Sequence, residues 1–417
     1  MSLHLIRQHL IRLDYLLAML IILSQVLEYG SFTSPFFYMT FVVTVLLWIC
    51  TAGEDFTRLD LFTLIIMVVT LIAVLVNGIA AGAAFSFSYL KKYIMFVCTL
   101  LFFAAAGRNG VDTRTRHMLV IMQLVTTLVM LGVYLTRTTS MYMLNGQVSS
   151  YLVFRFTNPQ LTALFLACMI MFLILAVVQE RSWFLKILSA AAVCCNGFFL
   201  IETQCRTALI AVVVFLVVLL ERTLLRRVRA PIWKWVMAVS AMMPIIVVMC
   251  YMQMLSQTWF QNMFSFMTGE GKGLDSRYFI WSSALSLLRE SPVFGTYYEA
   301  SGGAGYSQMH NTHLDIAVSY GVLTMILVCI FLYIVMQRVQ ERPDDGMEKK
   351  KSYRSVALIG FICAILLGSG EAALFSGGLG IYIYAGVFLL NFDRETPDAP
   401  ETVPPTLEEE PEEQEIV

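Results

Sequence analysis

One polar segment holds the residues of this chain best suited to chemistry. It spans residues 253–311, in a sequence that is otherwise almost continuously apolar. It contains Arg277 and Trp281, four residues apart, and it ends with His310 followed by Asn311. A neutral imidazole can take a proton from a hydroxyl, and a guanidinium can bind phosphate oxygens in a bidentate way. These residue types indicate a site for a phosphate, a sugar and a hydroxyl group.

Arg277 lies at the start of an expected helix, with Asp275 or Ser276 as its N-cap and Pro292 as its stop. Residues four apart share one face of a helix, so Arg277 and Trp281 are expected to project together. Arginine suits a phosphate, and an indole stacks on the apolar face of a sugar. The alternative is an amphipathic helix at the membrane interface that only covers the bundle.

His310 lies between a glycine-rich stretch, residues 301–305, and the start of the next hydrophobic run. In this position it can act as a general base, with Asn311 orienting the imidazole or the substrate. The alternative is a structural histidine at the membrane interface. His313 and Asp315 are close in sequence, but their spacing is not that of a zinc motif. We therefore predict neither a metal site nor a cofactor.

Two further charged residues stand at the ends of apolar runs. Arg206 precedes the run 209–220, and it either snorkels to lipid headgroups or forms part of a site. Ionisable residues at membrane depth are functional candidates by default, which favours the second interpretation. Glu371 lies near the outer end of an expected span, where it can pair with an arginine or anchor its helix. The sequence leaves both alternatives open.

The composition is that of a membrane protein. Of 417 residues, 58% are hydrophobic and 14% charged, whereas soluble domains carry about 25% charged residues. Apolar runs long enough to cross a bilayer as helices recur along the chain. The nine cysteines lie in or beside these runs, as small buried side chains do, and indicate no disulfide framework. We predict an all-α polytopic membrane helix bundle and no nucleic-acid partner.

The apolar runs predict about twelve spans and one large external loop. Spans one to nine fall in residues 1–252, the loop is 253–311, and spans ten to twelve fall in 312–392. Residues 393–417, rich in Pro and Glu, are expected to form a disordered cytosolic tail. The expected spans are 13–29, 36–52, 60–79, 90–106, 118–135, 160–178, 183–201, 206–220, 232–252, 312–336, 354–374 and 377–391.

The distribution of basic residues predicts the orientation. With the amino terminus inside, most of the 28 Lys and Arg residues lie on the inner side, as the positive-inside rule requires. The loop 253–311 then faces outward together with Arg206, and both termini are cytoplasmic. The outer segments hold eight basic residues: Lys91, Lys92, Arg137, Arg155, Arg206, Lys272, Arg277 and Arg289.

Four sequence marks, taken in order, resemble the O-antigen ligase and Wzy-type polysaccharide polymerase superfamily. They are an Arg that opens an apolar helix, an Arg-x-x-x-Trp element in a large external loop, a Ser-Pro-x-x-Gly turn, and a His-Asn-x-x-Leu element followed by a glycine. Here they are residues 205–209, 277–281, 291–295, and 310–314 with Gly321. The resemblance covers about residues 200–330 in detail. Where the family often has an aromatic residue within the His-Asn element, this chain has His313.

The resemblance implies a metal-independent glycosyltransferase of the GT-C type in a bacterial cytoplasmic membrane, with its active site facing outward. Its donor would be a glycan on undecaprenyl diphosphate and its acceptor a hydroxyl of another glycan. Arg206 and Arg277 would hold the diphosphate, and His310 would take the acceptor proton. The remaining candidate substrate-binding residues are Trp281, Asn311, His313 and Glu371. Membrane lipids and other polysaccharide-assembly proteins are the further partners implied.

Several functions remain open at this stage. A polymerase of lipid-linked repeat units is the first hypothesis, and a ligase that moves finished glycan to a lipid or other acceptor is the second. A flippase or transporter of lipid-linked glycan predicts charged residues inside several spans, yet spans six, eight and ten are nearly uncharged in their centres. A purely structural membrane protein gives no reason to gather two arginines and a histidine at one outer face.

Overall fold

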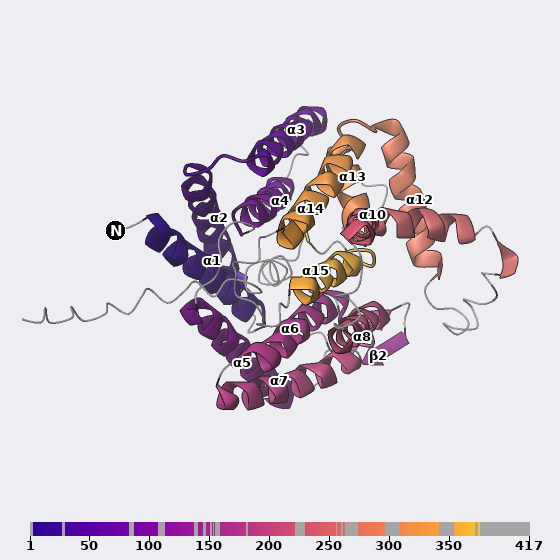
Figure 1. Ribbon diagram of the computed structural model, residues 1–417. Helices are drawn as coiled ribbons and strands as arrows, with labels where there is room; N and C mark the ends of the chain where they lie inside the picture. Colours follow the sequence, from indigo (N-terminus) through magenta and orange to yellow (C-terminus); the bar gives the residue numbers. More distant parts are fainter. Residues whose placement is uncertain are drawn as a thin grey trace, which may run out of the picture.

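The computed structural model describes most of the chain as a bundle of α-helices (Figure 1). The expected twelfth span, 377–391, and the tail, 393–417, lie outside the described residues. The described residues are 3–26, 30–82, 87–106, 113–136, 141–144, 147–150, 152, 154, 159–180, 182–221, 230–255, 257–259, 262, 274–296, 309–341, 354–371 and 374–375.

The helices match most of the expected spans closely. The first begins ten residues before the expected span, and the expected tenth span is divided into two helices, α13 and α14. The bounds are α1 Leu3–Val26, α2 Gly30–Ala52, α3 Arg58–Ala81, α4 Phe87–Ala106, α5 Thr113–Thr136, α6 Pro159–Gln179, α7 Trp183–Glu202, α8 Arg206–Leu220, α10 Ala230–Met254, α12 Leu274–Glu290, α13 Thr312–Tyr320, α14 Val322–Glu341 and α15 Arg354–Leu367.

Seven helices of the described part are long and apolar enough to cross a membrane: α2, α3, α5, α6, α7, α10 and α14. The short apolar helices α8 and α15, together with α1 and α4, occupy further expected positions. The chain is therefore a polytopic helical membrane protein. The expected number of about twelve spans stays a prediction, as does the GT-C type of fold.

A short β-hairpin interrupts the all-α pattern between α5 and α6, which the sequence interpretation did not anticipate. Strand β1, Met141–Leu144, pairs antiparallel with β2, Gln147–Ser150. The two intervening residues are Asn145 and Gly146, a pair that strongly favours a two-residue hairpin turn. Apolar periodicity of helices dominates the neighbouring sequence and conceals this local preference.

Helix α6 forms the centre of the part of the bundle that carries the site. Its apolar span is 83% buried, and it contacts α5, α7, α8 and α15 (Figure 1). A helix that is apolar on every side can be surrounded by other helices, because none of its faces requires a polar environment. Its amino-terminal end, at Pro159 and Gln160, reaches the site described below.

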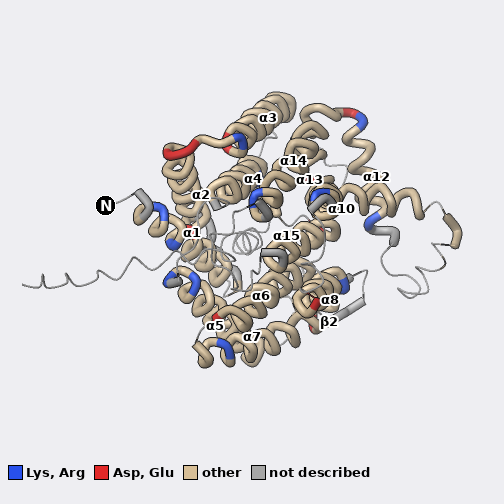
Figure 2. Tube along the Cα trace, viewed as in Figure 1, with Lys and Arg blue, Asp and Glu red and all other residues tan. Residues whose placement is uncertain are grey.

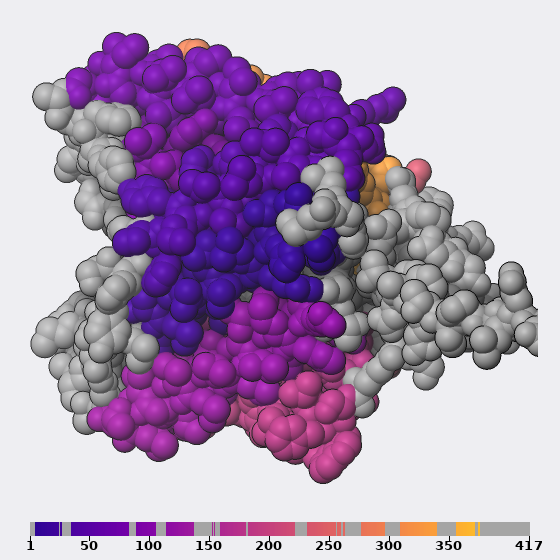
Figure 3. Space-filling model, turned by 90° about the vertical axis from the view of Figure 1, so that its left-hand side faces the viewer, coloured from indigo at the N-terminus to yellow at the C-terminus, as the bar shows by residue number. Residues whose placement is uncertain are grey.

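The distribution of charged and apolar side chains on the outside of the bundle is that of a membrane protein. Lys, Arg, Asp and Glu gather at the helix ends and connections, for example between α2 and α3 (Figure 2). Large apolar side chains such as Leu61, Leu75 and Leu128 are exposed on the outer helices. The amino-terminal helices, in indigo and purple, form much of one face of the molecule (Figure 3). Lipid contact explains such exposure.

Gly321 divides the expected tenth span because another part of the backbone passes directly against it. Its φ is +94°, and a Cβ on it would lie 1.8 Å from the carbonyl oxygen of Val293. The amide of Val322 donates to the carbonyl of Pro292 at 2.8 Å. Gly295, with a φ of +68°, makes a similar close approach to Val318. The Ser-Pro-x-x-Gly turn therefore docks on the α13–α14 junction.

Candidate functional site

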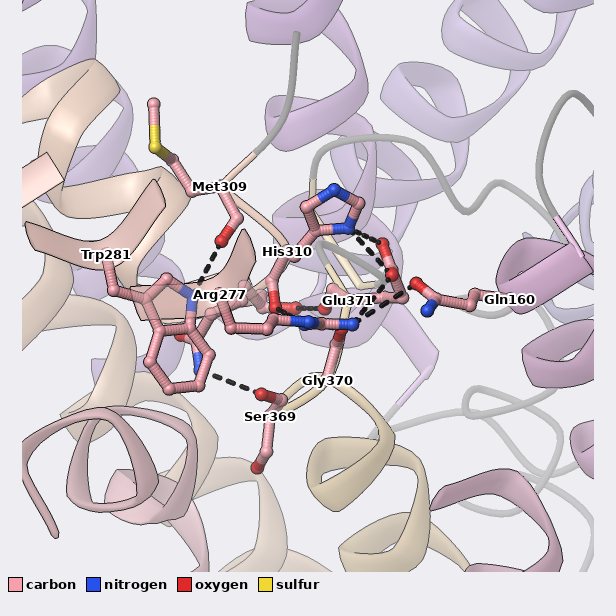
Figure 4. Close-up of polar contacts among 10 residues, drawn as sticks. Gln160, Arg277, Trp281, Met309, His310, Ser369, Gly370 and Glu371 are labelled. Carbon is pink, nitrogen blue, oxygen red and sulfur yellow. Dashed lines mark hydrogen bonds and ion pairs between the residues drawn. The ribbon is translucent and has the colours of Figure 1, made fainter. Parts of the chain in front are cut away.

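Four segments far apart in the sequence meet at one polar cluster (Figure 4). Arg277 comes from the first turn of α12, and His310 from the connection just before α13. Glu371 follows the end of α15, and Gln160 opens α6. The cluster thus connects the predicted external loop with α6 and with the end of α15. Arg277, His310 and Glu371, which the sequence singled out separately, are in direct contact.

Arg277 is the centre of this hydrogen-bond network. Its Nη1 donates to the backbone carbonyl of His310 at 2.9 Å and also to the carbonyl of Gly370. Its Nη2 donates to Oε1 of Gln160 at 3.2 Å and lies 3.3 Å from Oε1 of Glu371. A guanidinium has four terminal N–H groups and one Nε–H. The four contacts therefore use the four terminal donors, one for each acceptor.

Helix α12 places Arg277 as predicted, with a small difference at its start. The helix begins at Leu274, so the expected caps Asp275 and Ser276 lie inside its first turn. The helix ends at Glu290, and Pro292 follows two residues later, as predicted.

His310 and Glu371 form a close acid–imidazole pair. Nδ1 of His310 lies 2.8 Å from each of the two carboxylate oxygens of Glu371. The Glu371 side chain is only 3% exposed, whereas that of His310 is 26% exposed. The other ring nitrogen, Nε2, points away from Glu371 (Figure 4). Nδ1 of the imidazole is therefore engaged by Glu371, and Nε2 is directed away from it.

The backbone at His310 is held in an uncommon conformation. Its φ is +49°, in the left-handed region that few non-glycine residues adopt. Arg277 holds the carbonyl of this residue from one side. Immediately afterwards, Thr312 is tied to the end of α15: its amide donates to Gly368 at 2.8 Å and its hydroxyl to the carbonyl of Glu371 at 3.0 Å. Strained residues that are held in this way concentrate at functional sites.

Asn311 and His313 lie inside the bundle, which differs from the substrate contacts expected for them. Both are completely buried. The Asn311 amide donates to the carbonyls of Pro244 at 2.8 Å and Ser369 at 3.2 Å, and its Oδ1 caps α13 by accepting from Leu314. Nε2 of His313 lies 2.7 Å from the carbonyl of Ala241. These side chains join α13 to α10 and to the end of α15.

Trp281 also faces inward, so the expected stacking surface beside Arg277 is not present in this structure. The residue is 4% exposed, and its ring meets Tyr251 edge-on at 5.0 Å between centroids. The indole N–H donates to the carbonyl of Met309 at 3.0 Å. Helical spacing does place Trp281 near Arg277, but burial gives it a different task. It braces the backbone just before His310 (Figure 4).

Arg206 opens α8 beside the cluster and is exposed. The preceding thiol, Cys205, has its pKa raised mainly by burial. The charge of Glu371 raises that pKa further, and the charge of Arg277 lowers it. Thr207 packs against Gly370, since a Cβ on this glycine would lie 3.5 Å from the Thr207 hydroxyl. The start of α8 therefore adjoins the Arg277–Glu371 pair.

Glu371 pairs with Arg277, which decides between the alternatives left open for it. Its carboxylate also contacts His310 and is buried, so the substrate contact expected for it is not available in this arrangement. Gln160 is the member that the sequence interpretation missed. A polar side chain at the outer end of an apolar run, next to Pro159, is the feature that could have identified it.

Comparison with protein families gives one match, to the O-antigen ligase family (Wzy_C), over residues 190–329. Among curated proteins, none matches the chain. The matched segment contains Arg206, Arg277 and His310, while Glu371 and Gln160 lie outside it. Together with the apolar helices, the match supports a multi-pass membrane protein of the O-antigen ligase or polymerase type. It confirms the resemblance seen in the sequence: this chain is similar to the O-antigen ligase family in the segment that carries its arginines and its histidine.

Proposed function

We propose that this protein polymerises lipid-linked polysaccharide repeat units at the outer face of the cytoplasmic membrane. It transfers a glycan from undecaprenyl diphosphate to a hydroxyl of an acceptor glycan. The observation that carries the proposal is the partly exposed imidazole of His310, held at Nδ1 by Glu371 and near two arginines.

His310 is the general base of the proposed reaction. The Glu371 carboxylate contacts Nδ1, and Nε2 is directed away from this carboxylate (Figure 4). A positioned base of this kind contributes about 10²- to 10⁴-fold to a rate. The histidine needs a neighbouring site for the acceptor hydroxyl, and its partial exposure supports this.

The two arginines act on the donor in different ways. Arg206 is exposed at the start of α8, where the backbone N–H groups of a helix also favour an anion, so it binds the diphosphate directly. Arg277 uses its terminal N–H groups within the protein, and it contributes positive charge and its Nε–H. This division refines the expectation that both arginines hold the diphosphate.

In the proposed step the acceptor oxygen attacks the anomeric carbon of the donor glycan. The bond between this carbon and the phosphate oxygen breaks, and its electron pair leaves with undecaprenyl diphosphate. The acceptor proton moves to Nε2 of His310. Charge that develops on the leaving diphosphate is stabilised by the arginines, and fixed charges of this kind lower a barrier by several kcal/mol. The products are a lengthened lipid-linked glycan and free undecaprenyl diphosphate.

A ligase that moves finished glycan to a lipid or other acceptor uses the same chemistry and remains the second candidate. The two differ in the acceptor, which the cluster does not specify. A flippase is the candidate of another class. It requires no base, so a flippase would retain function when His310 is replaced.

The test is complementation of a host that lacks its own glycan polymerase and carries the cognate repeat-unit genes. We compare wild type with Arg206→Ala, Arg277→Ala and His310→Ala at matched membrane levels, and we read glycan length on a gel. Arg289→Ala and His9→Ala are matched controls, because both residues are exposed and lie away from the cluster.

A ladder of lengths with wild type and with both controls, and single units with the three cluster variants, supports the proposal. Single units with wild type, together with attachment of preformed polymer to an acceptor, identifies the ligase. Normal ladders with all three cluster variants overturn the mechanism.

A further inference from the structure

We propose that Glu371 is a positioning residue that keeps the proton of His310 on Nδ1, so that Nε2 is always the base. The inference rests on the proposed function, in which His310 removes the acceptor proton. It assigns to Glu371 a role different from substrate binding, and it adds a residue beyond the segment that matches the family.

The first argument is the geometry of the pair. An imidazole has two tautomers, and the hydrogen bond made by one nitrogen selects which nitrogen carries the proton. A carboxylate only accepts hydrogen bonds, and both oxygens of Glu371 lie 2.8 Å from Nδ1 of His310. The proton therefore belongs on Nδ1, and the lone pair belongs on Nε2.

The second argument is the environment of the carboxylate. Glu371 is 3% exposed, and an unpaired charge at that depth is costly. Arg277 supplies the compensating charge at 3.3 Å, so Glu371 can remain a carboxylate while the imidazole stays neutral. A neutral imidazole is the form that can accept a proton.

The third argument is that the backbone on both sides of the pair is fixed. The carbonyl of His310 receives Nη1 of Arg277, and the carbonyl of Met309 receives the indole N–H of Trp281. On the other side, the carbonyl of Glu371 receives the hydroxyl of Thr312. These bonds hold the two side chains at a constant distance, as orienting residues in catalytic triads do.

Glu371→Gln is the informative substitution, because the arrangement predicts how the new amide turns. Arg277 has only donors, so the amide oxygen faces Nη2 of Arg277 and the NH₂ group faces Nδ1 of His310. Nδ1 then faces a donor NH₂ beside the amide oxygen, where it had faced only acceptors, so the Nδ1–H tautomer loses its exclusive support, the Nε2–H tautomer becomes populated and the fraction of active base falls. Glu371→Asp keeps a carboxylate on a shorter side chain and should restore part of the function.

The experiment uses the full-length protein in lipid nanodiscs with lipid-linked repeat units extracted from a host that lacks a polymerase. We measure kcat and KM for the donor, and we record ¹⁵N spectra of histidine-labelled protein, with His310 assigned from the His310→Gln spectrum. The variants are Glu371→Gln, Glu371→Asp and, as control, Glu290→Gln, which alters an exposed carboxylate at the end of α12.

Glu371→Gln should lower kcat by about 100-fold or more with little change in KM. Its His310 signals should shift from the Nδ1–H tautomer toward the Nε2–H tautomer, Glu371→Asp should recover part of kcat, and Glu290→Gln should match wild type. An unchanged tautomer in Glu371→Gln, or an unchanged kcat, overturns the inference.

The spectra separate this inference from the proposed function. If wild type shows the Nδ1–H tautomer and Glu371→Gln loses it, while wild type transfers no glycan, the proposed function fails and the pairing role of Glu371 stands. If wild type transfers glycan but His310 is in the Nε2–H tautomer, glycan transfer stands, whereas Nε2 as the base and the role assigned to Glu371 both fail.

Discussion

Arg277 donates at once to the backbone carbonyl of His310 and to the side chain of Glu371, so one guanidinium fixes both partners of the acid–imidazole pair. The three residues come from the predicted external loop and from the end of α15, and His310 and Glu371 are 61 residues apart. Most of the N–H donors of Arg277 therefore bind groups of the protein, and this binding fixes the positions of His310 and Glu371.

His310→Ala should abolish most of the transfer activity and leave the fold intact. The side chain is 26% exposed, so its removal costs little packing, whereas loss of a general base lowers a rate by about 10²- to 10⁴-fold. Initial rates with purified protein in nanodiscs, together with the thermal unfolding midpoint, measure both effects. His9→Ala is the control, and a His310→Ala protein with wild-type kcat would contradict the base assignment.

Arg277→Lys should fail to replace arginine. A lysine presents one compact ammonium and cannot serve four acceptors spread over Gln160, His310, Gly370 and Glu371. Leaving a buried carboxylate partly unpaired should lower stability by about 1–3 kcal/mol. Thermal unfolding and activity are compared with Arg289→Lys, at an exposed position of the same helix. Equal unfolding midpoints and equal activity for the two variants would argue against the organising role.

Arg206→Ala should affect donor binding and leave stability unchanged. The residue is exposed at the start of α8, and a charge-assisted contact to phosphate contributes about 1.5–3 kcal/mol. We therefore expect KM for the lipid-linked donor to rise by about 10-fold or more, in proportion to the lost contact. Binding of undecaprenyl diphosphate to protein in nanodiscs provides a measurement independent of turnover. Unchanged affinity for this lipid would place Arg206 outside the donor site.

Gly321→Ala should strongly destabilise the protein. The φ of +94° disfavours any side chain, and the new Cβ would lie 1.8 Å from the carbonyl oxygen of Val293 in the docked turn. A clash with the backbone of Val293 and Phe294 is not relieved by rotamer changes, and we expect a loss of at least about 3 kcal/mol or failure to fold.

Gly132→Ala is the matched control for this substitution. A Cβ on Gly132, inside α5, meets nothing within 4 Å, so the expected effect on unfolding is neutral or slightly stabilising. Equal thermal midpoints for Gly321→Ala and Gly132→Ala would show that the turn does not dock on the α13–α14 junction as described.

Trp281→Phe tests whether this residue braces the site or contacts the substrate. The substitution keeps most of the buried ring but removes the hydrogen bond to Met309, at a cost of about 1–2 kcal/mol. We expect a lower unfolding midpoint and a lower kcat, with KM for donor and acceptor unchanged. An increase in KM for a glycan substrate, at constant stability, would instead support the stacking role expected from the sequence.

Local sequence patterns were sufficient for the helices. In a bilayer, backbone groups must form hydrogen bonds within the same segment, so an uncharged run such as that of α6 forms a helix. Helices α6, α7 and α8 begin within one residue of the predicted positions. The break at Gly321 could not be predicted in the same way, because it depends on Val293, which approaches from another part of the chain.

The sequence by itself determined the membrane character and the positions of most helices, and it singled out Arg206, Arg277 and His310 as candidate site residues. Residue type and spacing are local properties, and these conclusions depend on nothing else. The tertiary structure decided which neighbours each side chain meets: it turned Trp281, Asn311 and His313 into the interior, added Gln160, and joined Glu371 to His310. Burial and pairing depend on how distant segments pack, and one helical sequence pattern is compatible with many such packings.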